Sequence, residues 1–200
     1  MGGLIATGFC AKFPAMVSAL TLIAPMGISF MKIPNEKWLR KRWWAPGLDQ
    51  HIWFQKRNIK NEGEQHFFDT RDESPHRYLV DKQIAMTQWQ IENTPGYMEA
   101  LLSTLTIFPL RSTEELFAAV GRHPRPVLIL WGDRDQVTPC RDGVASMQAC
   151  FDNGTIVDIR DAGHNPLAEK FNDTMLELLS FAKESLATLQ TPETLDNLMR

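Results

Sequence analysis

Two acidic residues and a histidine stand directly after apolar segments near the end of the sequence. Asp133 and Asp135 follow the segment 127–131 (VLILW), and His164 follows the segment 156–159. If the two segments are neighbouring parallel strands, Asp135 and His164 project from one edge of the sheet, where functional groups of open parallel sheets gather. A carboxylate that accepts a hydrogen bond from an imidazole fixes the tautomer of the ring and stabilises its protonated form. The pair is therefore predicted to be a general base and its orienting acid.

The elements that must position these residues predict an α/β protein. Residues 1–30 are predicted to start the core, with a helix over 2–13 and a short buried strand over Val17–Ala24 that ends at a proline. Residues 124–190 return to the α/β pattern, with a strand, a helix, a second strand and a long helix from Asn165 onward.

The segment between these two parts has a different character. Residues 31–123 hold five of the six tryptophans, much of the charge and no strong strand pattern. Two stretches in it, RYLVDKQIAMTQWQIEN and GYMEALLSTL, have helical periodicity. We therefore expect a helical cap or lid over 31–123, and a polar tail over 191–200.

Composition excludes several classes of function. The net charge of −3 gives no clustered basic surface for nucleic acid. The three cysteines, Cys10, Cys140 and Cys150, form no CxxC motif, and the five histidines include no HExxH motif, so neither a metal nor another cofactor is predicted. An odd number of cysteines without a secretory leader indicates reduced thiols and a cytoplasmic location.

One uncharged stretch is long enough to be tested as a membrane span. Residues 13–31 carry no charge, but Pro14, Pro25 and Gly27 interrupt them, and the part around the predicted strand reads as buried core. A membrane span is therefore not expected. The Met-Gly-Gly start lacks the Ser or Thr that myristoylation requires, because Ala6 stands at that position.

The segments WGDRDQVTP and AGH, with the helical insertion before them, resemble the carboxyl-terminal part of a cap-bearing α/β-hydrolase. In that family the motif G-x-x-D-x-x-x-P supplies the acid of a catalytic triad, and it is matched by Gly132, Asp135 and Pro139. The family's Gly-His loop supplies the base, matched by Gly163 and His164. The resemblance implies a partial α/β-hydrolase fold, in which the last three parallel strands and their flanking helices carry a helical cap insertion.

The first residues resemble the same family at its nucleophile. Met1-Gly2-Gly3-Leu4 is similar to the second half of the elbow motif G-x-S-M-G-G-L, which places the missing Ser immediately before Met1. The resemblance implies that the backbone N–H of Met1 helps to form the oxyanion hole and that Gly2 and Gly3 are elbow glycines. The alternative is that the two glycines form a flexible amino terminus.

No residue of the chain replaces the missing nucleophile in this interpretation. Gly27-Ile28-Ser29 imitates the start of an elbow, but Met31 stands where the second glycine is needed. Ser18 and Cys10 lie on or beside packed elements, with no base expected near them. We therefore expect the chain by itself to be inactive.

By resemblance, the full-length form is a serine hydrolase of carboxylic esters, similar to esterases and lipases. Relatives with an Asp nucleophile, and proline-cleaving peptidases, often carry Trp after the nucleophile, where this chain has Met1. The cap, rich in Trp, favours a small apolar ester as substrate. The alternative is a non-catalytic interaction protein, or half of a hydrolase, that pairs with a partner through the open edge of the strand Val17–Ala24.

Overall fold

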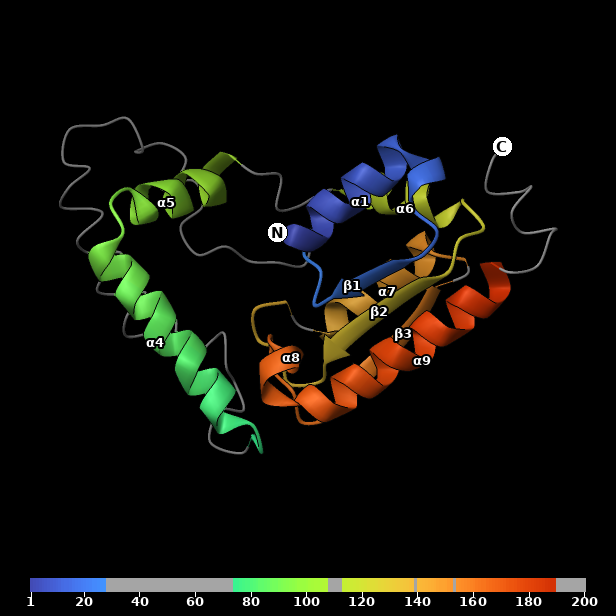
Figure 1. Cartoon of the computed structure of the whole chain (residues 1–200). Helices are drawn as coiled ribbons and strands as arrows, with labels where there is room; N and C mark the ends of the chain where they lie inside the picture. The colour runs from blue at the N-terminus through green and yellow to red at the C-terminus, as the bar shows by residue number, and fades with distance from the viewer. Residues whose placement is uncertain (28–73, 108–112, 139, 153, 190–200) are drawn as a thin grey trace.

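The computed structural model describes residues 1–27, 74–107, 113–138, 140–152 and 154–189 (Figure 1). In these residues, three parallel strands form one sheet in the order β1 (Leu20–Ile23), β2 (Val127–Gly132) and β3 (Gly154–Ile159). The pairing of β2 with β3 starts at Val127 and Gly154 and ends at Gly132 and Ile159. The two strands therefore end side by side, and the loops that follow them leave the sheet at the same edge.

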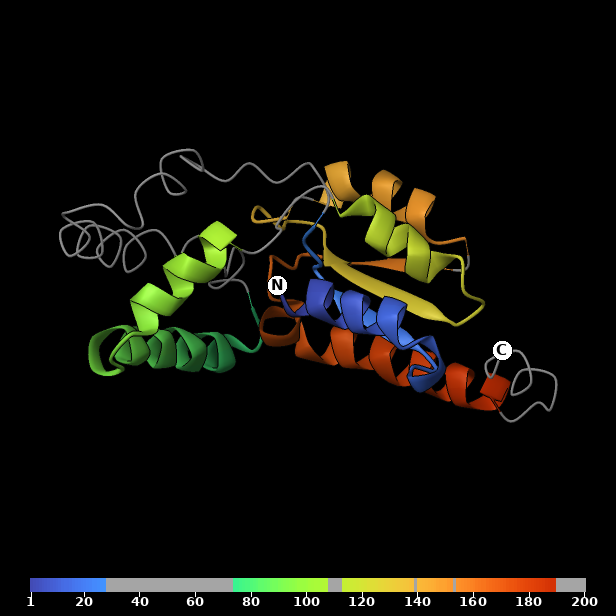
Figure 2. The same ribbon diagram turned by 90° about the horizontal axis from the view of Figure 1, so that it is seen from above.

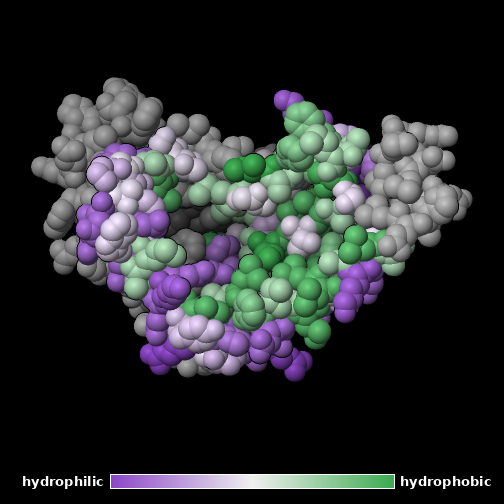
Figure 3. All heavy atoms as spheres, viewed as in Figure 1, coloured by the Kyte–Doolittle hydropathy of each residue, from purple (hydrophilic) through white to green (hydrophobic). Residues whose placement is uncertain are grey.

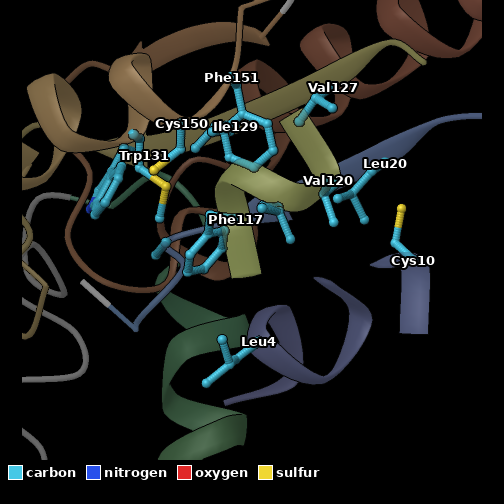
Figure 4. Close-up of a cluster of buried hydrophobic side chains, with 13 residues drawn as sticks. Leu4, Cys10, Leu20, Phe117, Val120, Val127, Ile129, Trp131, Cys150 and Phe151 are labelled. Carbon is cyan, nitrogen blue, oxygen red and sulfur yellow. The ribbon is translucent and has the colours of Figure 1, made fainter. Parts of the chain in front are cut away.

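The central strand β2 is apolar because it is covered on both faces. All six of its residues are buried, as expected for a parallel strand between two layers of helices. Side chains alternate between the faces of a strand. Ile129 and Trp131 face one cluster of buried residues, together with Phe117 (Figure 4), while Leu128 and Leu130 belong to a second cluster.

Helices cover the two faces unequally. The first cluster is covered by α1 (Gly2–Lys12), α6 (Glu114–Gly121) and α7 (Cys140–Cys150). The second is covered by α9 (Phe171–Leu189), through Leu178 and Phe181. In Figure 1, α1 and α9 lie on opposite sides of β1. The α/β class predicted from the sequence is confirmed.

Two helices of the predicted cap stand away from the sheet. They are α4 (Arg77–Asn93) and α5 (Tyr97–Ile107), and both views place them beyond the end of the sheet where β2 ends (Figures 1 and 2). Val80 and Ile84 of α4 pack against Ala168 of α8 (Pro166–Glu169), the short helix after β3. Helix α4 therefore packs against the chain close to the predicted histidine loop.

The predicted cap boundary at residue 123 differs from the packing. Helix α6 lies inside the predicted cap segment, yet its Phe117 and Val120 are buried in the first core cluster. Gly121 fits the same core tightly, because a Cβ atom there would come within 1.8 Å of the Cys150 carbonyl oxygen. By its packing, α6 belongs to the core and not to the predicted cap. Residues 28–73, most of the predicted first half of the cap, lie outside the described residues.

Two predicted elements have different limits in the structure. A 3-10 turn at Pro14–Met16 follows α1, so the strand predicted over Val17–Ala24 is β1 at Leu20–Ile23. The single helix predicted from Asn165 is two helices, α8 and α9, with a change of direction at Lys170. The break has a physical reason, since α8 is bonded to the histidine loop while α9 packs against the sheet. None of the helices in the described ranges is long and apolar enough to cross a membrane.

Candidate active site

Asp135 lies in the turn after β2, and its side chain is fully buried. Its Oδ1 accepts hydrogen bonds from the backbone N–H groups of Val137 and Thr138, both at 2.8 Å. This is the local geometry in which an Asp side chain stabilises a tight turn two residues ahead. Its Oδ2 accepts a third hydrogen bond from the Thr138 hydroxyl at 2.7 Å. The carboxylate is therefore fixed in orientation by its own loop.

His164 meets this carboxylate from the loop after β3. Its Nδ1 lies 2.9 Å from Oδ2 of Asp135, and the His164 side chain is 19% exposed. An ionised carboxylate can only accept, so Nδ1 carries the proton and donates it to Asp135. The other ring nitrogen, Nε2, is then the basic atom of the neutral imidazole. The structure thus brings together the two side chains that the sequence placed after neighbouring strands.

The two loops are also joined through their backbones. The N–H of Asp133 donates to the Ile159 carbonyl oxygen at 3.2 Å, and the N–H of Arg134 donates to that of Ala162 at 2.9 Å. The Arg134 guanidinium and the Asp161 carboxylate form an ion pair on the surface above them. Because both side chains are well exposed, that pair contributes little to stability. The backbone contacts hold the loop that carries Asp135 against the loop that carries His164.

Gly132 of the predicted acid motif has a steric role in this joint. A Cβ atom at position 132 would lie 2.2 Å from the Gly163 carbonyl oxygen and 2.4 Å from that of Ala162. Both are backbone atoms, which cannot rotate away as the end of a side chain can. Glycine at 132 therefore allows the histidine loop to approach the end of β2. Pro139, the last residue of the motif, lies outside the described residues.

Met1 precedes the first turn of α1, where its carbonyl oxygen accepts from the N–H of Leu4 at 3.0 Å. Figures 1 and 2 both show the amino terminus at the end of the sheet where β2 ends and α8 begins. Partial burial lowers the pKa of the Met1 α-amino group. The predicted elbow glycines meet no tight neighbour, since a Cβ at Gly2 has open space and one at Gly3 makes ordinary contacts.

Cys10 lies at the opposite end of the sheet from Asp135. The Arg125 guanidinium, just before β2, donates to the Cys10 sulfur at 2.8 Å. The length of β2 separates this contact from the acid loop by about 20 Å. Burial raises the pKa of the Cys10 thiol, and Arg125 opposes that shift. The position argues against Cys10 as the nucleophile, while Ser29 lies outside the described residues.

Sequence reasoning missed two side chains that hold the site, Thr138 and Glu169. Thr138 lies inside the acid motif and donates to Asp135, and its carbonyl oxygen accepts from the Trp131 indole at 2.6 Å. Glu169 is fully buried and binds the backbone on both sides of His164. Its signal was an acidic residue in the first turn of a helix that starts at Asn-Pro. Among the described residues, no group of three His, Cys, Asp or Glu side chains could hold a metal ion.

The chain is similar to a curated lipase and to solved structures of hydrolases. Lipase 1 of Psychrobacter immobilis is 24% identical over 174 residues, which cover 87% of this chain and 50% of the lipase. Among solved structures, a thermophilic esterase from Thermogutta terrifontis superposes with a TM-score of 0.61 at 20% identity, over 92% of this chain and 62% of the esterase. The hydrolase BphD of Rhodococcus sp. strain RHA1 gives 0.63 at 18% identity, over 92% of this chain and 61% of BphD.

The chain spans about half the length of the curated relative that it matches. At these identities, the structural likenesses show the fold alone. The model of the family described as alpha/beta hydrolase fold matches residues 1–171, which is most of the chain. The parallel sheet described above is consistent with that match, and the chain belongs to the alpha/beta hydrolase fold family.

Proposed function

We propose that this chain carries the acid and the base of a serine hydrolase that acts on carboxylic esters. The observation that supports the proposal is the hydrogen bond between a fully buried Asp135 and a partly exposed His164. The acid is sealed from water and oriented by three other donors, while the base retains contact with the surface. That combination suits a base that exchanges protons with a substrate beside it.

The chemistry would be acyl transfer in two halves. Nε2 of His164 removes the proton from a serine hydroxyl as its oxygen attacks the ester carbonyl, and the Asp135 carboxylate stabilises the imidazolium that forms. The imidazolium then gives the proton to the departing alcohol, which leaves an acyl-enzyme. In the second half, His164 removes a proton from a water molecule as the water oxygen attacks the acyl carbonyl. The imidazolium then gives this proton to the serine oxygen as the bond between that oxygen and the acyl group breaks, which releases the carboxylic acid and restores the serine.

The serine of this mechanism is proposed to lie directly before Met1, in a longer form of the protein. Two observations support this: the similarity of Met1-Gly2-Gly3 to an elbow, and the location of the amino terminus at the catalytic end of the sheet. In that form, the Met1 backbone N–H would help to bind the oxyanion. The 200 residues by themselves are proposed to be inactive, because nucleophile and base act as a unit.

The proposed substrate is a small apolar ester. Met86 and Trp89 are exposed on α4, in the cap that stands at the catalytic end of the sheet. The names of the relatives, a lipase and an esterase, point to the same bond. The other tryptophans of the predicted cap lie outside the described residues. We also propose a cytoplasmic location, on the composition of the chain.

The test is made on the protein from its source cell. The protein is captured with an antibody against this chain, treated with a fluorophosphonate probe that modifies activated serines, and digested for mass spectrometry. We expect a labelled peptide that runs through a serine into Met1-Gly2-Gly3-Leu4. A dominant species of about 22.8 kDa that begins at Met1 and takes up no probe would contradict the proposal.

A second function is favoured by a different observation. In the described residues, β1 pairs only with β2, so its other edge has no strand beside it. Figure 3 shows apolar residues gathered over β1 between α1 and α9. The exposed apolar side chains on those two helices include Ile5, Phe9, Leu176, Leu179 and Leu186. This surface would suit a partner polypeptide that adds a parallel strand at β1 and covers both helices.

The labelling experiment separates the two functions. A non-catalytic chain that begins at Met1 should be recovered with a partner polypeptide, and the probe should label neither this chain nor its tryptic peptides. Labelling of a serine on a separate partner would instead make the pair a hydrolase in two pieces.

A further inference from the structure

A buried carboxylate holds the backbone on both sides of His164. Oε2 of Glu169 accepts a hydrogen bond from the Gly163 N–H, and Oε1 accepts one from the Asn165 N–H, each at 3.0 Å. The Glu169 residue is completely buried. An ionisable side chain at such a depth is costly unless its hydrogen bonds are satisfied, so its presence needs an explanation beyond packing.

The turn that carries Glu169 is itself fixed from two directions. The Ser74 hydroxyl donates to the Glu169 carbonyl oxygen at 2.6 Å, which ties the turn to the segment before α4. The Thr174 hydroxyl at the start of α9 donates to the Pro166 carbonyl oxygen at 3.0 Å. These two hydrogen bonds restrict the movement of the turn from which the Glu169 side chain reaches the histidine loop.

We propose that Glu169 is a positioning residue that sets the direction of the His164 ring toward Asp135. The proposal rests on the proposed hydrolase function for its catalytic consequence, but its geometric part stands on the contacts alone. The two N–H groups that Glu169 binds belong to the residues immediately before and after His164. With both fixed, the Cα of His164 cannot rotate away, and Nδ1 stays within reach of Asp135.

The two hydrogen bonds require a side chain at position 169 with two acceptor oxygens and the length of glutamate. Glutamine has the same size, but one of its two acceptors becomes an NH₂ group that faces a backbone N–H, so one hydrogen bond is lost and two donors oppose each other. Aspartate keeps both oxygens and the charge, but it is one methylene shorter. We therefore expect both Glu169→Gln and Glu169→Asp to weaken the hydrogen bonds to the histidine loop. Of the two, Glu169→Gln changes the volume of the side chain less.

The test is nitrogen-15 NMR on the full 200-residue chain labelled at its histidines, recorded at pH 9 where neutral rings report their tautomer. The His164 signals are identified by their loss in His164→Gln. Wild-type protein should show a single His164 tautomer with the proton on Nδ1. Glu169→Gln should lower the ratio of that tautomer to the Nε2–H tautomer about tenfold, and Glu184→Gln, the same change on the exposed face of α9, should leave it unchanged.

Two outcomes would overturn the proposal. One is a Glu169→Gln protein that unfolds more easily in urea but keeps the wild-type His164 tautomer, since the residue would then serve stability only. The other is rapid hydrogen exchange at the Gly163 and Asn165 amides of the wild-type chain, which can be measured even if the variants fail to fold. None of these readouts needs a nucleophile, so they remain informative if the source protein takes up no serine-directed probe.

Discussion

At the scale of single residues, Asp135 and His164 are held in place in different ways. Asp135 is fixed by two N–H groups of its own turn and by the Thr138 hydroxyl. His164 comes from another loop and adds only one hydrogen bond to it, at 2.9 Å. The acid is thus organised locally and the base is organised by tertiary contacts, so the base is the more easily misplaced of the two.

The proposed catalytic roles of Asp135 and His164 are tested by substitution in the proposed serine-bearing form. His164→Ala should lower kcat by a factor on the order of 10³ or more, because the proton acceptor is lost. Asp135→Asn should lower kcat by a factor of about 10³–10⁴, because the amide no longer selects the tautomer with a basic Nε2. Both are measured as hydrolysis of a short-chain aryl ester.

Asp133→Asn is the matched control for these variants. Asp133 is the exposed acidic neighbour in the same turn, and it contributes its backbone N–H rather than its side chain to the loop contact. Turnover should therefore stay close to that of the wild type. Equal losses in Asp133→Asn and Asp135→Asn would show that charge near the site, and not the Asp135–His164 contact, is what matters.

At the scale of elements, the site is a junction between the turn after β2 and the loop after β3. The strands end in register, and backbone hydrogen bonds join the two loops. Helix α8 secures the histidine loop from the other side through Glu169. A change in any of these elements should therefore affect stability and the site together.

Gly132→Ala tests the tight approach of the two loops. A Cβ at 132 would overlap two backbone carbonyl oxygens, so the loops must move apart, with an expected loss of about 1–3 kcal/mol in the free energy of unfolding. Urea unfolding measures this. Gly8→Ala is the control, since a Cβ there meets nothing within 4 Å and should stabilise α1 by about 0.5–1 kcal/mol. Similar effects of both changes would contradict the steric argument.

The connection between α6 and β2 predicts a pH dependence. Burial, and to a lesser degree the Arg125 guanidinium, lower the pKa of His123 from its ordinary 6.5. The unfolded chain therefore takes up this proton more readily than the folded chain. The contribution of neutral His123 to the free energy of unfolding is fully present above pH 6.5. It is lost as the pH falls below 6.5, toward the lowered pKa of the folded chain.

Urea unfolding at pH 7.5 and at pH 5 measures this effect. The wild type should lose more free energy of unfolding between the two pH values than His123→Gln, which has no ionisable group at this position. An equal loss in both proteins would assign the pH dependence to other groups.

At the scale of the whole molecule, the sheet has a covered centre and an uncovered side. Strand β2 is buried on both faces, whereas β1 has a described neighbour on one edge only. On α9, Leu176 is 67% exposed and Leu186 60% exposed, although the helix has the periodicity of a core helix. Sequence periodicity marks the apolar face, and none of the described residues covers Leu176 or Leu186 on it.

We expect the 200-residue chain to self-associate through this surface when it is studied alone. Sedimentation velocity should show a weight-average mass that rises with concentration. Leu179→Lys combined with Leu186→Lys should reduce the association by placing charges on the exposed face of α9. Met86→Lys, at an equally exposed position on α4, is the control. A chain that stays monomeric at all concentrations would contradict self-association through this apolar surface.

The sequence alone determined the local parts of this protein. The apolar run at 127–131 predicted β2, which is buried on both faces, and a second run at 156–159 predicted β3, of which only Ile159 is buried. Helical periodicity predicted α4 and α5. The acid motif indicated Asp135 because turn formation after a strand is a local event. The resemblance of the acid and histidine motifs to those of α/β-hydrolases indicated the family, which is confirmed over residues 1–171.

Only the tertiary structure decided what joins these parts. Three features of the site link atoms from different elements. They are the contact between Asp135 and His164, the close approach of the histidine loop to Gly132, and the hydrogen bonds of Glu169 to the histidine loop. The break between the two helices at Lys170 also depends on tertiary contacts, because α8 is hydrogen-bonded to the histidine loop whereas α9 packs against the sheet. A one-dimensional pattern records which face of an element is apolar and where its turns lie. Distances between elements depend on packing against neighbours, which the pattern of one element does not contain.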